Sequence, residues 1–94
     1  MQAEDSGRYQ RSPSAEESQV GDRSVLYHRT SRKAVVLNPT GSVIWHLLAT
    51  PQTTHAVAQQ LQAQFPSLTL ERATSDASVF LQELRQHDLV LVEE

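Results

Sequence analysis

Large apolar side chains are almost absent from the first part of the chain and recur in regular patterns afterwards. Residues 1–17 contain only Met1 and Tyr9 as large apolar residues, so burial there cannot offset the conformational entropy lost on ordering. We therefore predict a disordered polar tail over residues 1–17 and one folded domain over residues 18–94. Residues 18–20 are a candidate for a short first strand of that domain.

Two β-prone runs open the predicted domain. Residues 24–29 and 34–37 are rich in Val, Leu and Tyr, and the polar stretch 30–33 separates them. This spacing predicts a hairpin with a loop of four or five residues. Pro39 ends the second strand because it has no N–H for further pairing.

Three amphipathic segments with helical spacing follow the hairpin. The first begins after residues 40–42 and stops before Pro51, and the second runs from Thr53 or Thr54 to Pro66. After a loop over residues 67–72, Thr74 or Ser75 is the expected cap of the third helix. The apolar faces of these segments predict a core made of Val43, Ile44, Leu47, Leu48, Val57, Leu61, Phe65, Phe80, Leu84 and Leu89.

The apolar run 89–92 closes the chain as a short strand or wing. Three short helices combined with a small N-terminal antiparallel sheet of two or three strands give an α+β fold. This order of elements predicts a winged helix-turn-helix.

Composition narrows the possible chemistry. The chain contains no cysteine, which excludes disulfides, thiolate metal sites and cysteine nucleophiles. No apolar run approaches the roughly 18 residues that span a bilayer, and no basic segment followed by an apolar one opens the sequence. We therefore expect a cytoplasmic protein without a membrane partner.

Charge argues against nucleic acid as a partner. The net charge is −3, and residues 23–94 carry six cations and six anions. The only cluster of cations is Arg29, Arg32 and Lys33, whereas nucleic-acid binders usually present a broad basic face. A DNA-binding winged helix remains the alternative, but the second helix offers glutamines to base edges and no cation to phosphates. These glutamines are Gln59, Gln60, Gln62 and Gln64.

No catalytic constellation is present in the sequence. The histidines, at positions 28, 46, 55 and 87, have no metal-ligand spacing. Asp76 and Glu83 could share a helix face, but a domain this small rarely encloses the cleft that a hydrolase needs. Gly41 alone cannot cradle a phosphate. We expect neither an enzyme nor a bound cofactor or metal.

Several segments together resemble the PqqD-like family, which is named after a protein of pyrroloquinoline quinone biosynthesis. Residues 35–45, VVLNPTGSVIW, resemble the family segment LNpTG..IW, and residues 51–61 resemble its helix opening T..ela..L. Residues 76–84, DASVFLQEL, resemble Dv..FL.eL, and Asp88 stands where the family has the glycine of GLl. The replacement of this glycine by Asp88 affects the C-terminal cap of the last helix. The Asn-Pro-Thr-Gly form is closer to the lasso-peptide B1 proteins than to the quinone-cofactor proteins.

The resemblance, which spans roughly residues 20–92, implies a recognition element for ribosomally made, modified peptides. Such domains bind the leader segment of a precursor peptide and present it to a partner, such as a radical SAM enzyme or a leader peptidase. The leader adds a strand to the sheet edge beside the third helix. The sequence leaves the oligomeric state open between a monomer and a swapped dimer, which edge strands and exposed hairpins favour.

An open sheet edge also suits such a role on physical grounds, since an extended peptide satisfies its unpaired N–H and C=O groups. We expect the peptide to contact the second strand at Lys33, Ala34, Val35, Val36 and Leu37. We expect the third helix to contribute Asp76, Phe80 and Glu83, with His87 on the same flank. The opposite flank, with Thr74, Ala77, Leu81 and Arg85, is the alternative.

Overall fold

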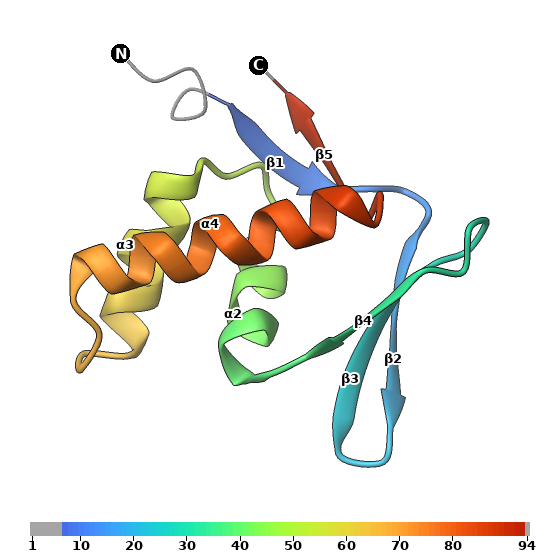
Figure 1. The fold of residues 1–94 in the computed structure, drawn as a ribbon, viewed down its shortest axis with the longest axis horizontal. Helices are drawn as coiled ribbons and strands as arrows, with labels where there is room; N and C mark the ends of the chain where they lie inside the picture. The colour runs from blue at the N-terminus through green and yellow to red at the C-terminus, as the bar shows by residue number, and fades with distance from the viewer. Residues whose placement is uncertain (1–6, 94) are drawn as a thin grey trace.

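Two antiparallel sheets and three helices make up residues 7–93, the part of the chain that the computed structural model describes (Figure 1). The elements follow one another as β1 (Arg8–Arg11), β2 (Ala15–Val20), β3 (Arg23–His28), β4 (Ala34–Leu37), α2 (Pro39–Leu47), α3 (Thr54–Gln64), α4 (Leu70–Gln86) and β5 (Val90–Glu93). The expected α+β class, with three helices and a small antiparallel sheet near the N-terminus, is confirmed.

The larger sheet has the strand order β2-β3-β4. A two-residue turn joins β2 to β3, and Gly21 takes a positive φ of 65° there, which suits a tight hairpin. In the predicted hairpin of β3 and β4, Val25 pairs with Val36 and Leu26 pairs with Val35. Because side chains alternate between faces, Leu26 and Val35 are buried against the helices while Val36 lies on the outer face.

Side-chain caps fix the start of each helix. Asn38 Oδ1 accepts a hydrogen bond from Gly41 N at 2.6 Å, and Pro39 occupies the first helical position of α2. The Thr53 hydroxyl caps α3 by accepting a hydrogen bond from Ala56 N. Of the two expected caps, Thr53 and Thr54, the first is therefore the observed one.

The predicted start of α4 is wrong. Thr69, not Thr74 or Ser75, caps the helix, and its hydroxyl accepts from Arg72 N at 3.1 Å. The Thr74 hydroxyl instead donates to the carbonyl of Leu70 inside the first turn. Most of the expected loop over residues 67–72 therefore belongs either to this cap or to the helix.

The predicted disordered tail is wrong wherever the structure describes it. Residues 8–11 form β1 and residues 15–17 belong to β2, while residues 1–6 lie outside the described part. β1 pairs with β5, and Tyr9 is only 4% exposed, with its hydroxyl accepting from Gln82 Nε2 at 3.1 Å. Backbone pairing and this one aromatic side chain anchor a segment that has little other apolar surface.

Arg11 also fixes β1 to the helices. Its guanidinium lies 4.6 Å from the centroid of the Trp45 ring, and Nη2 donates to the Trp45 carbonyl at 2.7 Å. The folded domain therefore begins before residue 18.

The core lies between the helices and the inner face of the larger sheet. Six predicted core residues are fully buried: Ile44, Leu48, Val57, Leu61, Leu84 and Leu89. The other four, Val43, Leu47, Phe65 and Phe80, are partly buried and pack against that core. The predicted list did not include the other buried apolar residues, which are Tyr9, Leu26, Val35, Leu37, Trp45, Ala58, Ala73, Ala77, Leu81 and Val90.

The end of α4 adopts the backbone of a Schellman motif. Leu89 N donates to the Leu84 carbonyl, and Asp88 N donates to the Arg85 carbonyl. Asp88 has a φ of 59°, which is the left-handed conformation that glycine adopts without strain. This turn directs the buried Val90 of β5 into its pairing with β1.

Candidate functional site

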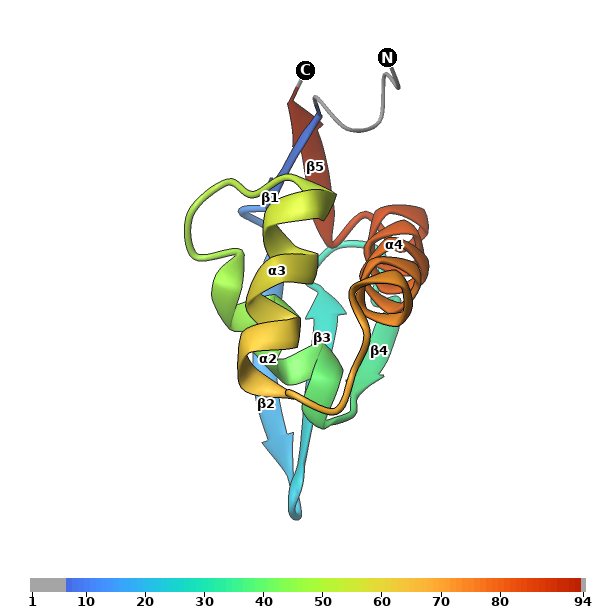
Figure 2. The ribbon, with the colours of Figure 1, turned by 90° about the vertical axis from the view of Figure 1, so that its left-hand side faces the viewer.

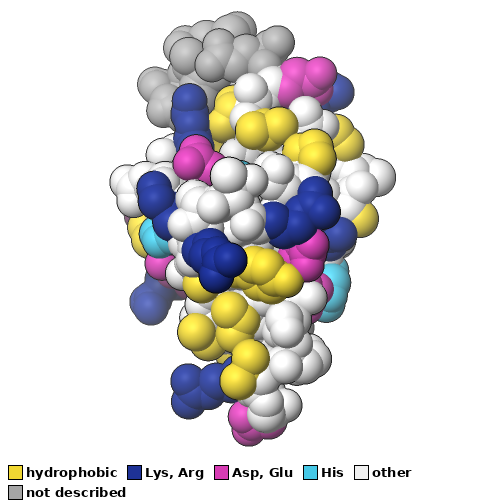
Figure 3. Space-filling view, turned by 90° about the vertical axis from the view of Figure 1, so that its right-hand side faces the viewer, with side chains coloured by type: hydrophobic (Ala, Val, Ile, Leu, Met, Phe, Trp, Pro, Cys, Tyr) yellow, Lys and Arg dark blue, Asp and Glu magenta, His cyan; other side chains and the backbone are white. Residues whose placement is uncertain are grey.

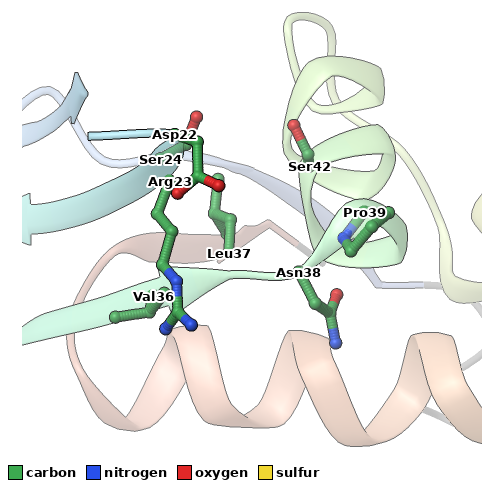
Figure 4. Close-up of a pocket in the computed structure, with 8 residues that line it drawn as sticks. All are labelled: Asp22, Arg23, Ser24, Val36, Leu37, Asn38, Pro39 and Ser42. Carbon is green, nitrogen blue, oxygen red and sulfur yellow. The ribbon is translucent and has the colours of Figure 1, made fainter. Parts of the chain in front are cut away.

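One edge of the larger sheet is open next to a helix. Among the described strands, β4 pairs only with β3, and α4 runs along its other side (Figures 2 and 4). Lys33 precedes the strand and is exposed, while residues 34–37 alternate between exposed and buried. The five strand residues expected at the site therefore lie on this open edge.

A cavity of about 320 Å³ lies between the end of β4, the start of α2 and one flank of α4. Asn38, Thr40, Gly41 and Ile44 line it from the strand–helix junction, and Asp76, Val79, Phe80 and Glu83 line it from α4. The structure thus brings together the three α4 residues that we expected at the site. His87 does not line the cavity, and its Nδ1 lies 2.9 Å from the Glu83 carbonyl oxygen.

The flank of α4 that borders this cavity is the one we favoured. On the alternative flank, Ala77 and Leu81 are fully buried in the core, so they cannot meet a ligand. Val79, which we did not single out, is 67% exposed and lines the cavity. The sequence did contain a signal for Val79: it is apolar and lies three residues after Asp76, a spacing that puts both side chains on the same face of a helix.

Gly41 sets how closely α4 approaches α2. A Cβ atom at this position would lie 3.0 Å from Phe80 Cζ and 3.1 Å from Phe80 Cε1. The phenyl ring therefore packs directly on the first turn of α2, where it forms a wall of the cavity. This close approach requires a residue without a side chain.

A second hollow, of about 520 Å³, surrounds the same end of β4 (Figure 4). Its lining comes from the β2–β3 turn and β3, from β4, and from the start of α2: Asp22, Arg23, Ser24, Val36, Leu37, Asn38, Pro39 and Ser42. Asn38 is common to both cavities. Nothing in the sequence pattern had marked Arg23 or Ser42 for this hollow, because its lining depends on the register of β3 against β4.

The outer face of the larger sheet carries exposed apolar side chains. Val20 is 63% exposed and Val36 is 55% exposed, and the half-buried Val25 lies beside Val36 in the register. Figure 3 looks onto this side of the molecule, where apolar side chains gather and Lys and Arg side chains surround them. The apolar surface therefore continues to the open edge of β4.

Charges differ between the two ends of β4. At its end, Asp76 and Glu83 line the cavity, and Asp76 also pairs with Arg72 at 3.4 Å. At its start, the β3–β4 loop carries Arg29, Arg32 and Lys33, the cationic cluster seen in the sequence.

One of these loop cations is already paired. Arg29 Nε lies 3.4 Å from the Glu16 carboxylate, and the Tyr27 hydroxyl donates to that carboxylate at 2.6 Å. This hydrogen bond to Glu16 raises the pKa of Tyr27 above its ordinary value. Arg32 and Lys33 remain exposed beside this network.

Within residues 7–93, no group of three or more His, Asp or Glu side chains is arranged to hold a metal ion. In the same part of the chain, no helix has the length and apolar character needed to cross a membrane.

Comparisons with known proteins agree with the fold and its motifs. The model of the family described as "Coenzyme PQQ synthesis protein D (PqqD)" matches residues 23–90. No curated protein sequence matches the chain.

Two solved structures share the fold. The structure of "TbiB1 in Complex with the TbiA(beta) Leader Peptide" has 23% identity and a TM-score of 0.74, covering 86% of this chain and 93% of that one. The structure of "Lasso peptide synthetase B1 complexed with the leader peptide" has 23% identity and a TM-score of 0.73, covering 88% of this chain and 96% of that one.

The family model covers β3, β4 and all three helices, including α2 and α4, which line the first cavity. This match confirms the resemblance carried by the Asn-Pro-Thr-Gly segment and the motifs of α3 and α4. The chain belongs to the PqqD family.

Proposed function

We propose that this protein is a non-catalytic peptide-binding module. It holds the leader segment of a ribosomally made precursor peptide as an added strand on β4. It then presents that peptide in the cytoplasm, where ribosomes make it, to a modifying enzyme such as a radical SAM enzyme or to a leader peptidase. The observation that carries this proposal is the open β4 edge beside the cavity lined by α4.

The two edges of the larger sheet differ in their suitability for strand addition. β2, at one edge, reads AEESQV, and Glu17 on its inner face lies 4.0 Å from His46 Nε2. Charged side chains of this kind protect an edge against pairing. β4, at the other edge, reads AVVL and carries no charge along its length. An extended peptide is therefore expected at β4.

Main-chain hydrogen bonds to β4 would supply affinity that is independent of sequence, and side chains would supply selectivity. Alternate side chains of the added strand would point toward α4. There, Val79 and Phe80 offer apolar contact, while Asp76 and Glu83 favour cationic or hydrogen-bonding groups. The chemical step is left to the partner enzyme.

The two structural neighbours support this proposal, since each is described as a B1 protein with a leader peptide. The DNA-binding alternative gains no support from the fold. α3, which would be the recognition helix, reads THAVAQQLQAQ and contains neither Lys nor Arg to neutralise phosphates.

NMR titration with the leader peptide encoded beside this gene tests the proposal. We expect amide shifts to concentrate in residues 33–37 and along the Asp76–Glu83 flank of α4. Shifts confined to α3 or to β5, or no shifts with any neighbouring leader, would contradict it.

A matched pair of variants on α4 sharpens this test. Val79 lines the cavity, whereas Leu70, 42% exposed at the start of the same helix, does not. Val79→Ser should weaken leader binding roughly three- to tenfold through lost apolar burial, and Leu70→Ser should leave the dissociation constant unchanged. Equal effects of the two variants would place the peptide elsewhere.

A further inference from the structure

Arg23 reaches the open edge of β4 from the neighbouring strand. It is the first residue of β3 and lies two residues before Val25, which pairs with Val36 of β4. Its side chain is therefore on the outer face of the sheet, together with these two valines. Adjacent strands lie only about 4.8 Å apart, so an extended arginine side chain can cross one of them. Figure 4 shows the Arg23 side chain crossing β4, with its guanidinium beyond Val36.

Arg23 takes part in none of the ion pairs formed within residues 7–93. Those pairs join Arg29 to Glu16, His46 to Glu17 and Arg72 to Asp76. Asp22, the acidic group that lines the same 520 Å³ hollow, forms no ion pair with Arg23 among the pairs of the described residues. The guanidinium thus offers several N–H donors at the place where an added strand would lie.

We propose that this hollow is a second side-chain subsite of the strand-addition site, in which Arg23 binds a carboxylate side chain of the bound peptide. The inference rests on the proposed function, because only a strand added to β4 brings a side chain to this position. The subsite lies on the outer side of β4, whereas the cavity lined by Phe80 lies toward α4.

Alternation along a strand then relates the two subsites. Successive side chains of an extended peptide point to opposite faces, and the two cavities meet at Asn38. A residue that enters the α4 cavity is therefore followed or preceded directly by one that points to Arg23. The recognised segment pairs an apolar or cationic residue, matched to Phe80, Asp76 and Glu83, with an adjacent Asp or Glu.

Selection from a displayed library of random eight-residue peptides tests this pairing. On the wild-type protein we expect enrichment of an acidic residue at one fixed position, next to an apolar or cationic anchor. On the Arg23→Glu variant, Lys or Arg should replace the acidic residue at that position, while the anchor stays the same.

The contribution of the carboxylate to binding is measured by comparing the affinity of the best selected peptide with that of its Glu→Gln or Asp→Asn analogue. The acidic form should bind the wild-type protein about two- to fivefold more tightly, as exposed ion pairs do. Arg23→Gln should abolish this difference, and so should high salt. The control variant Arg8→Gln, which removes an exposed cation from β1 in the other sheet, should preserve it.

Two failures are distinguishable. If the selected peptides shift β4 amides but their sequence preference is unchanged in Arg23→Glu, the subsite is wrong and strand addition stands. If the selected peptides leave the amides of residues 33–37 unaffected, the proposed function fails and the subsite fails with it.

Discussion

Replacing Gly41 by alanine should disturb the α4 cavity more than it disturbs the fold. The added Cβ would lie 3.0 Å from Phe80 Cζ, whereas unstrained carbon contacts lie at about 3.5–4.0 Å. The ring must therefore move by a few tenths of an ångström. Phe80 is only partly buried and borders the 320 Å³ cavity, so its ring can move into that space.

The stability change is a balance of two opposing effects. Overpacking typically costs about 1–3 kcal/mol, and the conformational preference of alanine over glycine in a helix returns up to about 1 kcal/mol. We expect Gly41→Ala to lower the free energy of unfolding by roughly 0–3 kcal/mol. Urea unfolding followed by the fluorescence of Trp45, the single tryptophan, measures this change.

A double-mutant cycle with Phe80→Leu isolates the contact. Leucine lacks the Cζ and Cε1 atoms that Cβ would meet, while the 3.1 Å approach to Asn38 Oδ1 is common to both backgrounds. In the Phe80→Leu background, Gly41→Ala should therefore cost about 1 kcal/mol less, or should stabilise. An equal cost in both backgrounds, within about 0.5 kcal/mol, would refute the role of Gly41 in admitting the Phe80 ring.

Three further changes test the fold. Asp88→Gly should raise the free energy of unfolding by about 0.5–1 kcal/mol, and with it the urea midpoint, because glycine adopts the observed φ of 59° without strain. An unchanged midpoint would contradict the Schellman cap. Leu84→Ala should cost about 2–5 kcal/mol, since the side chain is fully buried; a cost below about 0.5 kcal/mol would place it on the surface. A chain that starts at residue 18 should melt well below the full chain, because it lacks Tyr9 and the whole of β1; equal melting temperatures would mean that β1 contributes nothing.

Local patterns were sufficient where a strand or helix is bounded by strong signals. β4 was predicted with its observed bounds because a polar loop precedes it and Pro39 follows it. Helical periodicity also placed Asp76, Phe80 and Glu83 on one flank of α4, at i, i+4 and i+7, but it did not decide which of the two flanks lines the cavity.

Patterns failed where distant or competing partners decide the structure. β1 is held by β5, from the opposite end of the chain, so its polar sequence alone could not reveal a strand. Thr69, Thr74 and Ser75 are equally good caps by residue type, and the choice of Thr69 extends the helix over the buried Ala73. The Arg23 hollow depends on which β3 residue lies beside the end of β4, which no local pattern specifies.

An open apolar edge such as β4 is ordinarily a risk, because it can pair with the edge of another copy. In this molecule the helix α4 runs along that edge (Figure 4), and Val79 and Phe80 border the cavity between α4, the start of α2 and Asn38, the residue that follows β4. A single extended peptide needs only the width of one strand, about 4.8 Å from β4. The edge of another folded sheet brings its neighbouring strands and covering side chains with it, and these would collide with α4. The same helix that supplies side-chain contacts to a peptide therefore restricts what can pair with the edge, so that β4 can remain unpaired without the charges that protect β2.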